Sequence, residues 1–194
     1  MRKLRTLILA SASQQRRELL EQIGLKFIVD PSDIPEARHL NISPEELVKT
    51  LSLEKIRAVA SKYPDAIIIA ADTIGVSKGK VIGKPNSAEE ARQMLQMLSG
   101  KSHRVVTGLT VLETTSKKTL TRIIETRVYI KKLSSTEIRN YVETGEPLDK
   151  AGAYAIQGIG SVIVEKIIGD YYNVVGLPLY ALSECLKEFG ISVL

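Results

Sequence analysis

The chain has 194 residues, a length that fits one domain and can bury a substantial core. Its 44% hydrophobic and 25% charged fractions are those of an ordinary soluble globular protein, and no apolar stretch approaches the roughly 20 residues of a membrane span. The formal net charge of +5 allows an anionic ligand, while no tryptophan and two phenylalanines argue against a base-stacking nucleic-acid platform.

The pattern of apolar residues and caps predicts strands and helices along the whole chain. The expected elements are a strand at 7–10, a helix through 17–23, a strand at 27–29, a helix from 43 to before Pro64, a strand at 66–71, a hairpin over 74–82, a helix over 87–98, long paired strands at 105–112 and 119–130, a helix from 134 to Gly145, a strand at 162–168 and a helix at 179–189. Capping boxes are expected at 43–46 and 87–90, and a helix cap at 134–137. Crossovers and hairpins together indicate a mixed α/β fold, with 1–194 as a single domain.

The strand at 66–71 is the most informative of these elements. It is continuously apolar and too short for a typical helix, so it indicates an interior strand covered on both faces. We expect it to stop at Asp72-Thr73. Ligands of open α/β sheets bind beyond the carboxyl ends of strands, which places Asp72 well for chemistry, although a turn-capping role explains the same residue.

Other polar segments interrupt the pattern. The stretch 11–17 carries hydroxyls, glutamines and arginines at a strand-to-helix transition, which suits a phosphate, although a serine N-cap with a solvated face explains it equally. Carboxylates follow at 33–36, a lysine in 83–85, and a long polar loop at 145–158. Carboxylates that hold a divalent metal and cations that offset phosphate charge are what phosphoryl transfer needs.

Rival catalytic sets find little support in the sequence. Two histidines exclude a His-rich metal site, and His103 is expected to be structural. The single cysteine, Cys185, excludes an internal disulfide, fits a reducing cytoplasm and is expected in the core of the last helix. Lys55 could join the cations, but its residue type alone favours a solvated side chain, because lysine is rarely buried unless paired.

In their order along the chain, these motifs resemble the Maf family of nucleoside triphosphate pyrophosphatases. The matching segments are Leu9-Ala10-Ser11-Ala12-Ser13 with Arg16, Glu18-Leu19-Leu20, Glu36, Lys55, Ala71-Asp72-Thr73, Gly83-Lys84-Pro85, Leu98-Ser99-Gly100, His103, Thr107-Gly108 and the block from Glu146 to Gln157. The resemblance implies a long mixed β-sheet flanked by helices, with two lobes around a cleft, of the inosine triphosphatase type. It also implies hydrolysis between the α- and β-phosphates with a divalent cation, Mg²⁺ or Mn²⁺.

The resemblance also implies roles for individual residues. Asp72 matches the proton acceptor, and with Glu36 it is expected to hold the metal. The cations and hydroxyls expected to face phosphate are Arg16, Lys55, Lys84, Lys150, Ser11 and Ser13. Positions linked to base selection are Gln15, Thr73 and Gln157. The segment 173–178 is similar to the branch that acts on dTTP and UTP.

One position departs from the family pattern. The family usually has Ser-Pro-Arg-Arg after the first strand, whereas this chain has Ser13-Gln14-Gln15-Arg16, so Gln15 replaces an arginine. Arg17 lies about 100° further around the helix than Arg16 and cannot simply substitute. The substitution bears on the preferred base more than on the reaction.

The working hypothesis is a cytoplasmic pyrophosphatase of dTTP, UTP and modified relatives. It binds neither nucleic acid nor membrane, and a homodimer is allowed. The alternative is a non-enzymatic regulator of cell division that binds nucleotide or a protein partner.

Overall fold

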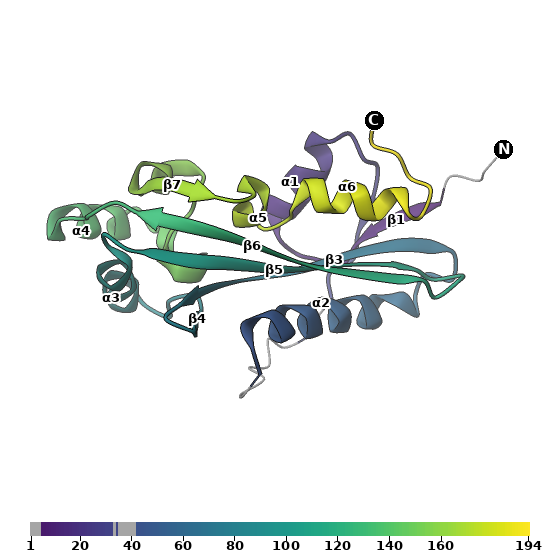
Figure 1. Cartoon of the computed structure of the whole chain (residues 1–194), viewed down its shortest axis with the longest axis horizontal. Coiled ribbons are helices and arrows are strands. Elements are labelled where there is room, and N and C mark those ends of the chain that lie inside the picture. Colours follow the sequence, from purple (N-terminus) through teal and green to yellow (C-terminus); the bar gives the residue numbers. More distant parts are fainter. Residues whose placement is uncertain (1–4, 33, 35–41) are drawn as a thin grey trace.

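The computed structural model describes residues 5–32, 34 and 42–194, and Figure 1 shows their arrangement. The strands are β1 (Thr6–Leu9), β2 (Ile28–Val29), β3 (Ala66–Ser77), β4 (Lys80–Ile82), β5 (Ser102–Glu113), β6 (Thr119–Ile130) and β7 (Val164–Ile168). The α-helices are α1 (Gln14–Gln22), α2 (Pro44–Ala60), α3 (Ala88–Leu98), α4 (Ser135–Glu143), α5 (Tyr171–Val175) and α6 (Leu179–Lys187). Short 3-10 helices cover Glu146–Asp149, Ala151–Ala153 and Gly158–Ile163.

The strands form one seven-stranded mixed sheet in the order β2-β1-β3-β5-β6-β7, with β4 paired to β3. β1 is parallel to both β2 and β3, whereas every other pair is antiparallel. In Figure 1, α1 and α6 cover one face of the sheet and α2 covers the other. The predicted mixed α/β sheet flanked by helices is therefore confirmed.

The alternation of side chains along β3 explains why both faces are covered. Ile67 and Ile69 pack in a cluster with residues of α1 and α6, whereas Ile68 packs on the opposite face with Ile56 of α2. Ile67, Ile68 and Ile69 are all fully buried. Cys185 lies in the first cluster, which confirms its expected place in the core.

The strand at 66–71 was predicted to stop at Asp72. In the structure it continues to Ser77. The antiparallel partner β5 accompanies it from Ile67 to Val76. Its parallel partner β1 ends earlier, at Leu9, which lies opposite Ile69. Asp72 therefore lies inside a strand rather than at its end. It still lies beyond the carboxyl end of β1, at the kind of position where α/β sheets bind ligands.

The capping serines lie where the sequence placed them. The predicted capping boxes at α2 and α3 are not complete, whereas the cap predicted at α4 forms one. Ser134 and Glu137 cap each other's backbone at α4. At α2, Ser43 accepts from the Glu46 N–H. At α3 the Glu90 carboxylate instead accepts from the Asn86 N–H at 2.8 Å, one residue before the N-cap.

Later boundaries also differ from the prediction. A 3-10 helix occupies Gly158–Ile163, so β7 begins at Val164 rather than at residue 162. The short α5 was not predicted at all, because five residues show too little periodicity to reveal a helix.

A glycine in β5 allows α2 to approach the sheet closely. A Cβ on Gly108 would lie 2.3 Å from the Val48 carbonyl oxygen and 2.9 Å from the Lys49 nitrogen. Backbone atoms cannot move aside easily, so we expect Gly108→Ala to lower the free energy of unfolding by about 2–3 kcal/mol, as overpacking does. Urea denaturation would measure this, with Gly83→Ala as control, because nothing lies within 4 Å of a Cβ there. Equal midpoints would contradict the close packing.

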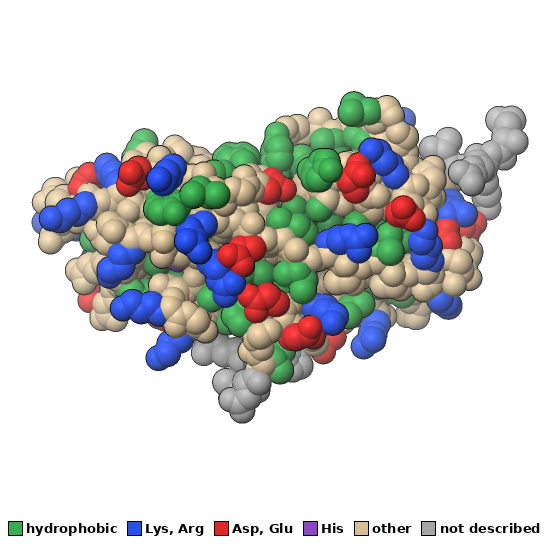
Figure 2. Space-filling view, in the orientation of Figure 1, with side chains coloured by type: hydrophobic (Ala, Val, Ile, Leu, Met, Phe, Trp, Pro, Cys, Tyr) green, Lys and Arg blue, Asp and Glu red, His purple; other side chains and the backbone are tan. Residues whose placement is uncertain are grey.

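The surface carries charges of both signs. On the face drawn in Figure 2, basic and acidic side chains are interspersed over the elements, as the modest net charge suggests. Within the described ranges, no helix is long and apolar enough to cross a membrane.

Candidate active site

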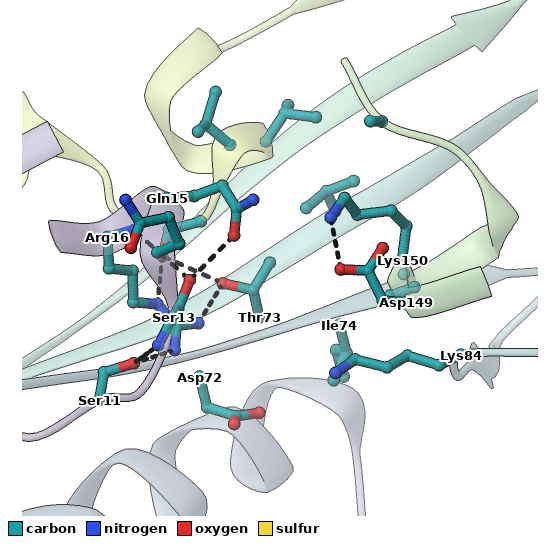
Figure 3. A pocket seen from close by; sticks show the side chains of 18 of the residues that line it. Ser11, Ser13, Gln15, Arg16, Asp72, Thr73, Ile74, Lys84, Asp149 and Lys150 are labelled. Carbon is teal, nitrogen blue, oxygen red and sulfur yellow. Dashed lines mark hydrogen bonds and ion pairs between the residues drawn. The ribbon is translucent and has the colours of Figure 1, made fainter. Parts of the chain in front are cut away.

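A cleft of about 780 Å³ opens where β1 ends beside β3. One wall consists of the β1–α1 loop and the end of α5, and the other of the loop over 146–158. The cleft brings together the predicted site residues Ser11, Ser13, Gln15, Arg16, Lys55, Asp72, Thr73, Lys84, Lys150 and Gln157. Glu36 lies outside the described residues. Figure 3 shows the cleft from close by.

The carboxylate of Asp72 forms an ion pair with Lys55 of α2. The Lys55 ammonium donates directly to Asp72 Oδ1. Only 14% of the Lys55 side chain and 9% of the Asp72 side chain are exposed. The prediction of a solvated Lys55 from its residue type is therefore wrong. Helix α2 packs over β3, and the lysine reaches an acid there that no local pattern reveals.

The strand places Asp72 and Thr73 on opposite sides, as Figure 3 shows. Asp72 points toward α2, whereas the Thr73 hydroxyl lies 2.9 Å from the Thr107 hydroxyl and accepts from Arg16. Both side chains line the cleft, because no β1 residue continues beside them. The cleft therefore offers a carboxylate on one side, at Asp72, and on the other a hydroxyl beside the Arg16 guanidinium, at Thr73.

Arg16 joins three segments that are far apart in sequence. Its guanidinium donates to the Gly176 carbonyl oxygen at 2.8 Å, the Ser11 hydroxyl at 3.1 Å and the Thr73 hydroxyl at 3.1 Å. These bonds hold the β1–α1 loop, β3 and the residue after α5 in one arrangement.

The start of α1 shows how Gln15 is held. Ser13 caps the helix by accepting from the Arg16 N–H at 3.4 Å, and its hydroxyl donates to Gln15 Oε1 at 3.2 Å. That bond leaves the amide NH₂ group of Gln15 as the donor that a ligand could meet. Arg17 pairs instead with Glu21 at 2.8 Å on the exposed side of the helix. As predicted, Arg17 does not take the place of the missing arginine.

The opposite wall supplies two more cations. Lys84 follows β4, and the Gly83 carbonyl oxygen accepts from the Gly152 N–H at 3.0 Å, which ties this segment to the loop over 146–158. Lys150 Nζ lies 2.8 Å from Asp149 Oδ2. Lys84 forms no ion pair with any of the described residues, and Figure 3 shows its side chain extending toward Ile74.

Sequence reasoning assigned no role to several residues that line the cleft, among them Tyr154. His103 on β5 is 4% exposed, and its Nε2 lies 2.9 Å from the Tyr154 hydroxyl. Burial lowers the pKa of His103 to about 4, so its ring is neutral at pH 7. The pair ties β5 to the loop that carries Lys150 and Gln157, which agrees with the structural role expected for His103.

This burial predicts a specific pH dependence of stability. The folded-state pKa of His103 lies below its ordinary value of 6.5, so as pH falls the unfolded chain takes up the proton first. Stability is then lost as pH falls from 6.5 to about 4, by up to about 3 kcal/mol. We expect the free energy of unfolding of His103→Gln to fall less than that of the wild type between pH 7 and pH 4, as measured by urea denaturation. Identical losses in both proteins would contradict a buried neutral imidazole.

The donor set is compatible with a divalent cation that binds together with phosphate. Searching the described residues finds no group of three or more histidine, cysteine, aspartate or glutamate side chains that could hold a metal by themselves. Mg²⁺ commonly takes one or two carboxylates and completes its shell with substrate phosphates and water. Asp72 is suited to that role, because its Oδ1 accepts from Lys55 while none of the described residues donates to its Oδ2.

A family model and full-length relatives agree on one family. The family model described as Maf-like protein matches residues 6–189. The chain is 48% identical to the dTTP/UTP pyrophosphatase of Methanosarcina mazei over 98% of this chain and 97% of that one. It is 50% identical to the dTTP/UTP pyrophosphatase of Alkaliphilus metalliredigens over 97% and 98%. Among solved structures, the Ham1 protein of Staphylococcus aureus matches at 15% identity with a TM-score of 0.46, covering 82% of this chain and 79% of that one.

Proposed function

Because this chain belongs to the Maf-like protein family, as its motifs predicted, we propose that it is a nucleoside triphosphate pyrophosphatase acting on dTTP and UTP. Relatives that are 48% and 50% identical in sequence, over nearly the full length of both chains, are named dTTP/UTP pyrophosphatase. The reaction is hydrolysis of the bond between the α- and β-phosphates, which gives a nucleoside monophosphate and pyrophosphate.

The observation that supports this proposal most is the ion pair between Lys55 and Asp72 in a cleft with further cations. Arg16, Lys84 and Lys150 line the same space. A triphosphate carries several negative charges, which cations in a cleft stabilise more strongly than in bulk water. A carboxylate among these cations can hold or accept a proton where an anionic substrate binds.

In the proposed reaction, a water oxygen attacks the α-phosphorus while the Asp72 carboxylate accepts a proton from that water. The new bond joins the water oxygen to the α-phosphorus, and the bond from that phosphorus to the bridging oxygen breaks. Pyrophosphate leaves with the electron pair of the broken bond. Arg16, Lys84 and Lys150 stabilise the charge that develops on phosphate oxygens, and Lys55 orients the Asp72 carboxylate.

We propose that Mg²⁺ or Mn²⁺ is required. Asp72 would hold the cation together with the triphosphate, and Glu36 would assist, as the family resemblance implies. When bound, the cation withdraws charge from phosphate oxygens and favours cleavage.

Base selection is proposed to depend on Gln15, Thr73 and Gln157. The hydrogen bond from Ser13 holds the Gln15 amide in the cleft without the charge of an arginine. A neutral amide can both donate to and accept from the edge of a pyrimidine. The homodimer and the cytoplasmic location stay predictions.

The proposal can be tested by incubating purified protein with each of the common ribo- and deoxyribonucleoside triphosphates and Mg²⁺ or Mn²⁺. We expect pyrophosphate to be released fastest from dTTP and UTP, and no release in EDTA. Release of orthophosphate alone would contradict cleavage between the α- and β-phosphates. A higher rate with a purine nucleotide would contradict the proposed preference.

A further inference from the structure

One carboxylate closes the loop that forms a wall of the cleft. The loop begins at Glu146, which follows α4, and its far end is the 3-10 helix Gly158–Ile163. Lys150 and Gln157, both predicted site residues, lie on it. The Glu146 side chain accepts from the Tyr141 hydroxyl at 2.7 Å, the Gly160 N–H at 2.7 Å and the Ile159 N–H at 2.9 Å.

Tyr141 extends these contacts to a second point on the loop. Its hydroxyl donates to Glu146 and accepts from the Ala155 N–H at 3.1 Å. The ring is 5% exposed, and burial together with the Glu146 carboxylate raises the pKa of the tyrosine. The hydroxyl therefore keeps its proton for Glu146. Gln157 lies between two backbone groups that are held in this way, the N–H groups of Ala155 and Ile159.

Two glycines leave the space that these contacts need. A Cβ on Gly158 would lie 2.2 Å from Glu146 Oε1, and that glycine has φ +70°, a conformation that other residues rarely adopt. A Cβ on Gly160 would lie 2.3 Å from the Tyr141 hydroxyl. The backbone at 158–160, just after Gln157, therefore packs directly against the Glu146 carboxylate and the Tyr141 hydroxyl.

We propose that Glu146 and Tyr141, here called the clasp, are positioning residues that set base discrimination by holding Gln157 at the cleft. This inference rests on the proposed function. Nothing in the clasp needs to touch the reacting phosphates, because its hydrogen bonds go to the protein's own groups. Its effect should therefore fall on substrate binding and selection rather than on the chemical step.

Glu146→Gln tests the clasp with little change in size. Glutamine has one acceptor oxygen, and its NH₂ group must face a donor, so at least one of the three bonds is lost. We expect the KM for dTTP to rise about tenfold with kcat changed less than about threefold, since an uncharged bond replaces charge-assisted ones. The preference for dTTP over dGTP, as a ratio of kcat/KM values, should fall by a similar factor. Tyr141→Phe should act in the same direction.

The matched control is Glu143→Gln, which changes an exposed glutamate at the end of α4, shortly before Glu146. It should keep wild-type KM and preference. A double-mutant cycle separates positioning from general stability. If Glu146 acts through Gln157, then Glu146→Gln should change the dTTP preference much less when Gln157→Ala is already present. Circular dichroism should show that each variant is folded.

The outcomes separate this inference from the function on which it rests. A wild-type protein that releases no pyrophosphate from any nucleotide would overturn the proposed function. An active wild type whose KM and preference are unchanged in both clasp variants would overturn the clasp alone. Equal effects of Glu146→Gln with and without Gln157 would also overturn it, because the carboxylate would then not act through that residue.

Discussion

Replacing Asp72 with asparagine is expected to lower kcat for dTTP by about 10²- to 10⁴-fold, the usual contribution of a general base. Asparagine has the same shape and can still accept from Lys55, but it cannot take a proton from water. It also lacks the charge that a divalent cation prefers. The KM should change only a few-fold, because the cations along the cleft remain in place.

Initial rates of pyrophosphate release at saturating dTTP would measure this effect. Asp65→Asn is a suitable control, since it removes an exposed carboxylate just before the same strand. Full turnover by Asp72→Asn would mean that this carboxylate neither accepts the proton nor holds the cation. The proposed mechanism would then be wrong even if pyrophosphate is the product.

Replacing Lys55 with glutamine is expected to affect both activity and stability. The buried Asp72 carboxylate would lose its cation, and an unpaired buried charge is costly, so we expect the free energy of unfolding to fall by about 1–3 kcal/mol. The carboxylate would also lose its fixed orientation, and kcat/KM should fall by about 10²-fold.

Lys49→Gln is the matched control for this change. Lys49 lies in the same helix and pairs with Glu46 at 3.2 Å, but 43% of its side chain is exposed. Surface pairs of this kind contribute at most about 1 kcal/mol. If the two variants lost equal activity and equal stability in urea denaturation, the buried ion pair would have no special part in the site.

Much of the fold could be predicted from local patterns. Serine caps marked the starts of α2, α3 and α4, and the apolar run of β3 marked a strand that is buried on both faces. The hairpin expected over 74–82 is confirmed by the pairing of β3 with β4. What could not be predicted is that its first strand continues the strand at 66–71 through Asp72 and Thr73, because that continuity depends on pairing with distant residues of β5.

For the candidate site too, one part could be predicted from the sequence and another could not. Its polar residues could be found because they interrupt apolar elements, and their order matched a family. Their contacts could not be predicted, because the partners are far apart in sequence. Arg16 donates a hydrogen bond to the Gly176 carbonyl oxygen, and His103 forms one with the Tyr154 hydroxyl. Glu146 was visible only as one acid in a long polar loop. Its three hydrogen-bond partners, Tyr141, Ile159 and Gly160, could not be predicted, because they lie beside Glu146 only in the folded loop.

The most direct test of the central claim is hydrolysis of dTTP in water labelled with ¹⁸O, followed by mass spectrometry of the products. Attack on the α-phosphorus with loss of pyrophosphate predicts one ¹⁸O atom in dTMP and none in pyrophosphate. Label in pyrophosphate or orthophosphate, with unlabelled dTMP, would contradict the account.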